Sequence, residues 1–217
     1  SSGIHGANRL GSNSLSELGV FGKVAGITAT RYARRAAVAQ NATLERLAQD
    51  IEHRTLSLIG ADGGTERLAV LRDEMARSME AGCGIYRVGA EMQATCDTIA
   101  ALKERYRRIQ LDDRSRVWNT EWLAAIELGY QLDVAEAIAH SAINRRESRG
   151  AHQRLDDFNT RDDASFLKHT LAYYRPDAPP RIDYGPVTIT RSPPGKRAYG
   201  AEGERIEQTG GGASHVA

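Results

Sequence analysis

The sequence predicts a mainly α-helical protein, in which a loop and a capped helix lead into an antiparallel helical bundle and then a short C-terminal β-hairpin. Apolar residues recur at helical spacing up to about Ala142, and short polar or Gly-containing breaks separate these stretches. After Lys168 the pattern changes to short runs of β-branched and aromatic residues between prolines. With 217 residues, of which 41% are hydrophobic, the chain can bury a core.

The first helix is predicted to begin at Ser14, because Ser14 and Glu17 have the spacing of a capping box. Its glycines at 19, 22 and 26 would weaken an isolated helix. They therefore predict close packing against a sheet or a ligand.

Four further helices follow from apolar spacing. They are expected at 42–59, from a cap at Thr65 to Gly82, at about 90–108, and from Asn119 onward. Strands are expected at 170–174 and 187–190, separated by prolines. The Gly-rich, polar tail from residue 200 is predicted to be disordered.

Bulk composition excludes several classes of protein. A formal net charge of +1 argues against a nucleic-acid-binding protein. No apolar stretch approaches the roughly 18 residues of a membrane span. The two cysteines, Cys83 and Cys96, are too few for a disulfide framework and lack metal-ligand spacing, so both are interpreted as reduced thiols and no metal site is predicted.

The segment from His5 to Leu15 is the richest candidate site. Its glycines permit close backbone approach, Arg9 lies between them, and a helix N-terminus follows, where free N–H groups and the helix dipole favour an anion. Arg9 adds a planar fork of donors that matches a carboxylate. The alternative is an ordinary capped helix behind a Gly-containing turn.

A second cluster runs from Arg145 to His152. Cations at a helix end complement the dipole, and Gly150 is a typical helix terminator, so the cluster has a purely structural interpretation. The functional alternative is that Arg149 and His152 connect the bundle to another domain.

Several stretches, in order, resemble the C-terminal part of the flavoprotein subunit of quinol:fumarate reductase or succinate dehydrogenase. They are HGANRLGSNSLSEL with VFGKVAG, EAGCGIYR, WNT, RESRGAH, KHTL, and the PP pair before KRAY. The resemblance covers residues 1 to about 200.

The resemblance implies roles for particular residues. Arg9, helped by Ser12, would hold one carboxylate of the dicarboxylate substrate, and Asn13, Ser14 and Leu15 would contact FAD. His5 is expected to make a structural hydrogen bond in the loop. Arg149 and His152 would lie between the bundle and the flavin domain.

The resemblance also implies a division of the chain. Residues 1–35 would end the FAD-binding domain, 36–64 would form a connecting helix and linker, and 65–168 the helical bundle domain. Residues 169–199 would form the short strands and 200–217 the tail.

The implied function is fumarate–succinate interconversion by hydride transfer with FAD, which is attached covalently upstream. The chain has no GxGxxG fingerprint and opens without Met, so it is expected to be a processed or truncated fragment that is inactive alone. Expected partners are an iron–sulfur subunit, which passes electrons to or from a quinone, and membrane anchor subunits at the cytoplasmic face of a bacterial inner membrane. Fumarate reductase is preferred to succinate dehydrogenase, and a non-enzymatic docking module for an iron–sulfur protein is the other alternative.

Overall fold

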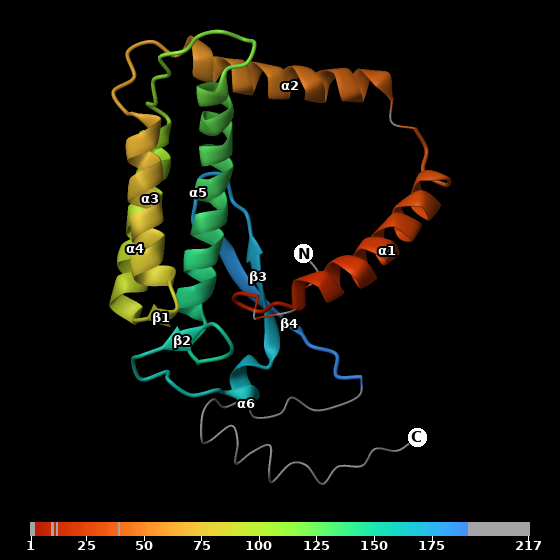
Figure 1. The fold of residues 1–217 in the computed structure, drawn as a ribbon, viewed down its shortest axis with the longest axis vertical. Helices are drawn as coiled ribbons and strands as arrows, with labels where there is room; N and C mark the ends of the chain where they lie inside the picture. Colours follow the sequence, from red (N-terminus) through yellow and green to blue (C-terminus); the bar gives the residue numbers. More distant parts are fainter. Residues whose placement is uncertain (1–2, 10, 12, 39, 191–217) are drawn as a thin grey trace. The chain divides into compact units, whose positions relative to one another are not determined.

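The computed structural model describes residues 3–9, 11, 13–38 and 40–190. Within them the protein is mainly helical, as predicted, with two small two-stranded sheets (Figure 1). The chain divides into two units, Ser1–Gly185 and Pro186–Ala217. No helix of the described part is long and apolar enough to cross a bilayer. Ser12 and the tail predicted to be disordered lie outside the described residues.

Helix α1 (Asn13–Ala33) begins one residue before the predicted cap at Ser14, and none of its residues is buried. A Cβ added to any of its glycines, at 19, 22 and 26, would meet nothing within 4 Å. The close packing predicted for these glycines is therefore not made within the described part of the chain.

Helix α2 (Asn41–Gly60) is joined to the bundle through its C-terminal end. Ile59 is buried, Leu58 packs against the core, and the indole N–H of Trp122 donates to the Thr55 carbonyl at 2.8 Å. The apolar residues nearer its start, Leu44, Leu47 and Ile51, are exposed.

The core lies between α3 (Leu68–Cys83), α4 (Gly89–Tyr106) and α5 (Thr120–Asn144), which run side by side in Figure 1. The five-residue connection at 84–88 reverses the chain, so α3 and α4 are antiparallel. Gly82 makes their close approach possible, because a Cβ there would lie 2.2 Å from Thr95 Oγ1 and 2.6 Å from the Glu91 carbonyl oxygen. The buried apolar cluster consists of Leu71, Ile99, Leu102, Ile109, Leu111, Ala125, Leu128, Leu132 and Ala135.

Two of the predicted helix starts have different outcomes. Asn119 caps α5 as expected, since its side chain accepts from Trp122 N–H at 2.7 Å. The cap at Thr65 is wrong, because α3 begins after Arg67. Thr65 N–H donates to the Arg108 carbonyl at 3.0 Å, within a short parallel bridge between Glu66 and Ile109. Pairing with a distant segment thus replaces capping.

The C-terminal sheet pairs β3 (Lys168–Tyr173) with β4 (Arg181–Pro186). Their connection at 174–180 is shorter than the dozen residues of a parallel crossover, so the pair is the predicted hairpin. The second strand was expected at 187–190, which is wrong. Residues 181–184 alternate exposed and half-buried, which is strand periodicity with polar residues on the outer face.

Three short elements of the structure were not predicted from the sequence. The strands β1 (Tyr86–Arg87) and β2 (Gln153–Arg154) pair in parallel and join the end of α3 to the segment after α5. Helix α6 (Asp163–Phe166) is a single turn, capped by the Asp162 side chain, which accepts from Ser165 N–H at 2.9 Å. Elements of two to four residues are too short to create a periodic signal.

Candidate functional site

A side-chain contact between His5 and Glu17 fastens the loop before α1 to the helix. His5 Nε2 lies 2.6 Å from Glu17 Oε2, and both side chains are half-buried. Gly3 and Gly6, with φ of 71° and 59°, adopt the left-handed region on either side of His5, where glycine is unstrained. His5 therefore makes a structural hydrogen bond, as expected, but its partner Glu17 lies in α1 and not in the loop.

The predicted substrate and cofactor residues that the structure describes, Arg9 and Asn13 to Leu15, lie at or just before the start of α1. Arg9 is exposed in the loop, and Asn13, Ser14 and Leu15 form the first helical turn. That turn contains no acidic residue, so no carboxylate within it offsets the positive dipole end. Leu15 is 82% exposed and places apolar surface beside the helix N–H groups. The arrangement can therefore hold an anion next to an apolar group.

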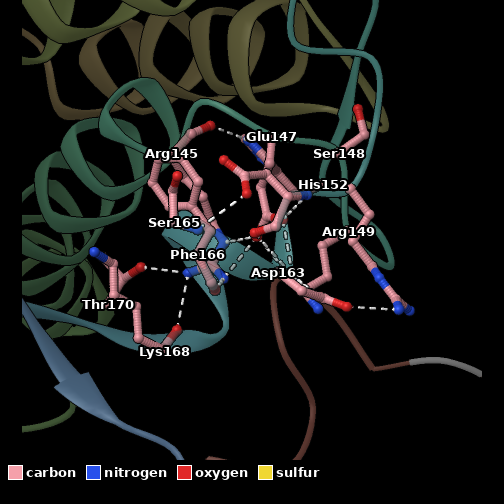
Figure 2. Close-up of polar contacts among 12 residues, drawn as sticks. Arg145, Glu147, Ser148, Arg149, His152, Asp163, Ser165, Phe166, Lys168 and Thr170 are labelled. Atoms are coloured by element: carbon pink, nitrogen blue, oxygen red, sulfur yellow. Dashed lines mark hydrogen bonds and ion pairs between the residues drawn. The ribbon is translucent and has the colours of Figure 1, made fainter. Parts of the chain in front are cut away.

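The second cluster is organised around a buried carboxylate, that of Glu147 (Figure 2). Glu147 is fully buried. Its Oε1 accepts from Arg145 Nε at 2.9 Å and Arg149 Nε at 2.8 Å, and its Oε2 accepts from Arg149 Nη2 and Asp162 N–H, both at 2.9 Å. We call Arg145, Glu147 and Arg149 the Glu147 cluster.

The charge state of Glu147 follows from these contacts. Burial by itself raises the pKa of a carboxyl group, but the hydrogen bonds from Arg149 and Asp162 N–H and the charge of Arg145 outweigh it. The pKa of Glu147 is therefore lowered from its ordinary value, and the side chain is an anion between two guanidinium groups.

Arg145 also ties the end of α5 to the segment that leads into β3. Its Nη1 donates to Thr170 Oγ1 at 2.8 Å and to the Lys168 carbonyl at 3.2 Å, while Nη2 donates to the Phe166 carbonyl at 2.5 Å. Figure 2 shows the contacts from Thr170 and Lys168 meeting at the guanidinium of Arg145. The Arg145 side chain thus binds backbone carbonyls of both α6 and β3.

His152 is 2% exposed and links the segment after α5 to strand β1. Arg87 Nη1 lies 2.8 Å from His152 Nδ1, and His152 Nε2 lies 2.9 Å from the Arg145 carbonyl. Because a guanidinium only donates and a carbonyl only accepts, the imidazole is neutral with its proton on Nε2. Burial lowers the pKa of His152 to about 4, and the charge of Arg87 acts in the same direction.

The structure brings the two predicted interdomain residues together. Arg149 and His152 face each other in an isolated antiparallel bridge, with N–H···O distances of 2.9 Å and 3.0 Å. Arg149 also donates to Asp163 at 2.7 Å. The side chains of both residues are thus engaged within this chain, and their role at a domain boundary stays a prediction.

Sequence reasoning missed Glu147 and Arg87, and one signal pointed to the first. Arg145, Glu147 and Arg149 alternate along the chain, and in extended backbone alternate residues point to the same side. An acid between two bases at that spacing indicates a local ion-pair cluster. Arg87 carried no such signal, because its partner is 65 residues away.

The described residues outside the loop offer little further chemistry. None of their His, Cys, Asp and Glu side chains form a group of three or more that could hold a metal ion. An open hollow of about 840 Å³ lies beside the Glu147 cluster. Its lining mixes both signs of charge, including Arg146, Arg161, Asp157 and Asp162, so it favours no single class of ligand.

Comparison with known proteins gives a consistent result. Residues 72–199 match the family model described as fumarate reductase flavoprotein C-term. The chain is 55% identical over 208 residues to the fumarate reductase flavoprotein subunit of a Serratia species, covering 95% of this chain and 35% of the relative. It is 34% identical over 203 residues to the succinate dehydrogenase flavoprotein subunit of Rickettsia bellii, covering 90% of this chain and 34% of the relative.

Among solved structures, the chain resembles the FrdA protein of Escherichia coli quinol fumarate reductase. The TM-score is 0.84 at 52% identity, covering 90% of this chain and 34% of that one. The chain therefore spans about a third of the length of the curated relatives it matches.

Proposed function

Because this chain belongs to the family of fumarate reductase and succinate dehydrogenase flavoprotein subunits, we propose that it forms the C-terminal portion of a fumarate reductase flavoprotein subunit. Its higher identity to a fumarate reductase relative than to a succinate dehydrogenase relative supports that choice. The activity of the whole subunit is the interconversion of fumarate and succinate. Electrons are exchanged with quinol or quinone through the iron–sulfur clusters of a partner subunit.

The start of α1 fits one edge of the FAD cofactor. FAD, when bound, accepts or donates the hydride and is attached covalently upstream of this chain. Asn13 and Ser14 would present backbone and side-chain polar groups to it, while Leu15 offers the exposed apolar surface that a flat ring system covers. The acid-free first turn would stabilise negative charge on the cofactor edge through its N–H groups.

Arg9 would hold one carboxylate of the dicarboxylate, with Ser12 beside it. A guanidinium binds a carboxylate through two parallel hydrogen bonds and so sets its orientation as well as its charge. The contact between His5 and Glu17 fastens the loop that carries Arg9. The observation that carries the proposal is therefore an exposed arginine in a fastened loop, directly before an acid-free helix N-terminus.

The proposal also covers location and partners. We place the subunit at the cytoplasmic face of a bacterial inner membrane, held there by an iron–sulfur subunit and membrane anchor subunits. One observation supports this: the similar solved structure belongs to a quinol fumarate reductase.

The test compares Arg9→Lys with the unmodified sequence in the longer subunit. Lysine keeps the charge but loses the fork, so flavin should be retained while kcat/KM for fumarate falls at least roughly a hundredfold, or about 2.7 kcal/mol. The flavin-to-protein ratio and fumarate-dependent oxidation of a reduced dye are measured together.

Arg31→Lys is the matched control, because Arg31 is exposed in the last turn of the same helix. It should leave both quantities unchanged. Near-normal efficiency for Arg9→Lys with full flavin would remove Arg9 from the site. A longer subunit that holds no flavin and shows no turnover would instead favour the docking-module alternative.

A further inference from the structure

Helix α5 has two apolar faces, and only one of them belongs to the bundle core. The first is buried against α3 and α4, which both lie on the same side of α5 in Figure 1. Its residues are Ala125, Leu128, Leu132, Ala135, Ala139 and Ala142, each at most 5% exposed. This face is sufficient for the packing of α5 against α3 and α4.

The second face points away from the bundle. Leu123, Tyr130, Val134 and Ile138, which we call the α5 stripe, are 55%, 58%, 58% and 44% exposed. At 3.6 residues per turn they fall within roughly 80° of one another and extend over about 22 Å, with their centre roughly 135° from the centre of the buried face. The stripe is therefore a second apolar face, separate from the buried one, and it is interrupted only by the exposed Glu127 between Leu123 and Tyr130.

The composition of the stripe is that of a covered surface. A helix face in contact with water normally carries charged and polar residues, and a helix that is apolar all round is normally buried. Along α5, Glu127 is the one acidic or basic side chain on the stripe side, since Asp133 lies towards α4 and pairs with Lys103 at 2.9 Å. Depletion of charge is typical of the core of an interface.

We propose that the α5 stripe docks against the part of the flavoprotein subunit that precedes this chain in sequence. This inference rests on the proposed function, because it takes the chain as the C-terminal third of a longer subunit. Most of the length of the curated relatives lies outside the match, which provides an occupant of sufficient size.

The size of the surface favours this occupant over a separate molecule. A stable interface between free proteins generally buries more than about 1,000 Å². Four side chains on one helix supply only part of that area. A covalently attached domain is held at high effective concentration, so a small apolar face is enough to seat it.

Thiol accessibility tests the proposal directly. Val134→Cys places a reactive group in the stripe, and Ala101→Cys is the matched control, since Ala101 is exposed on α4 near the charged residues Asp97 and Glu104. Burial raises the pKa of Cys83 and raises that of Cys96 to about 11, so the natural thiols react slowly. Both variants are labelled with a maleimide in this chain alone and in the longer subunit without partner subunits.

The expected result is equal labelling in this chain alone, and at least tenfold slower labelling of Val134→Cys in the longer subunit while Ala101→Cys is unchanged. Tyr130→Cys should behave like Val134→Cys, which guards against a local effect of one substitution. Circular dichroism should show that all three variants are folded.

Other outcomes overturn the proposal. If Val134→Cys is labelled slowly in this chain alone, and more slowly at higher protein concentration, the stripe is covered by a second copy of the chain. Slow labelling that appears only when the iron–sulfur subunit is added would indicate that partner. If Val134→Cys and Ala101→Cys are labelled equally fast in a longer subunit that binds flavin and reduces fumarate, docking is refuted and the proposed function stands. Slow labelling of Val134→Cys in a longer subunit that has neither flavin nor activity would support docking and would count against the proposed function.

Discussion

Glu147 and His152 are buried polar side chains that hold together the segment after α5. Glu147 accepts four N–H groups, and His152 bridges Arg87 and the Arg145 carbonyl. Removing one partner of a buried ion pair costs about 3–5 kcal/mol, because the other charge stays buried without compensation. The arginines of this cluster thus act on stability, whereas Arg9 in the loop is the candidate for substrate.

The buried His152 predicts a pH dependence of stability. Its pKa of about 4 in the folded protein lies below the ordinary value of 6.5, so the unfolded chain takes up the proton first. The contribution of neutral His152 to stability is present above pH 6.5 and is lost as the pH falls from 6.5 towards 4. That difference corresponds to about 3 kcal/mol.

Urea unfolding of this chain at several pH values between 4 and 7.5 measures this effect. The unmodified chain should lose about 3 kcal/mol more than His152→Gln between pH 6.5 and pH 4. His53 is exposed on α2, so His53→Gln should follow the unmodified curve. Parallel curves for the unmodified chain and His152→Gln would show that His152 takes up a proton without disturbing the fold.

At the scale of elements, α1 and the bundle helices differ in how much they bury. Helix α1 has no buried residue, whereas α4 buries Met92, Thr95, Cys96, Ile99 and Leu102. Because tertiary packing supplies most of the stability of a helix in water, α1 should open far more often in this chain.

Hydrogen exchange should therefore separate the two regions. Amides within residues 65–146 should exchange at least roughly a hundredfold more slowly than those within 5–30, or about 2.7 kcal/mol in opening free energy. Removing the first 35 residues should leave protection in the bundle unchanged. Equal protection in both regions would mean that the domain boundary predicted near residue 35 is wrong.

For the whole molecule, the limiting fact is that the chain spans about a third of its curated relatives. We predict that this chain alone neither retains flavin nor reduces fumarate, because the nucleotide-binding fold that holds the pyrophosphate and adenine is expected upstream. Two measurements on the purified chain test this: flavin absorbance after incubation with FAD, and oxidation of a reduced dye with fumarate. Stoichiometric flavin, or turnover above a boiled control, would contradict it.

The presence of the long helices and of a C-terminal hairpin could be predicted from the sequence alone, although the position of the second strand and the start of α3 could not. The apolar spacing of α4 and α5 and the Asn119 cap are local signals, and a helix is determined largely by residues within a few positions of each other. The loop before α1 was recognisable for the same reason, since Arg9, Asn13, Ser14 and Leu15 are neighbours in sequence. The ordered motifs also placed the chain in its family, which the comparisons confirmed.

Only the tertiary structure decided the features that join distant segments. Thr65 pairs with Arg108 instead of capping α3, and Arg87 reaches a histidine 65 residues away. Residues 181–184, which alternate exposed and half-buried, pair with β3 as strand β4. The β-branched run at 187–190, where the strand was expected, does not. In each case a backbone or charged group is satisfied by a partner that folding brings near, and such a partner leaves no trace in local residue spacing. The second apolar face of α5 became visible in the same way, once α3 and α4 were seen to occupy only the first.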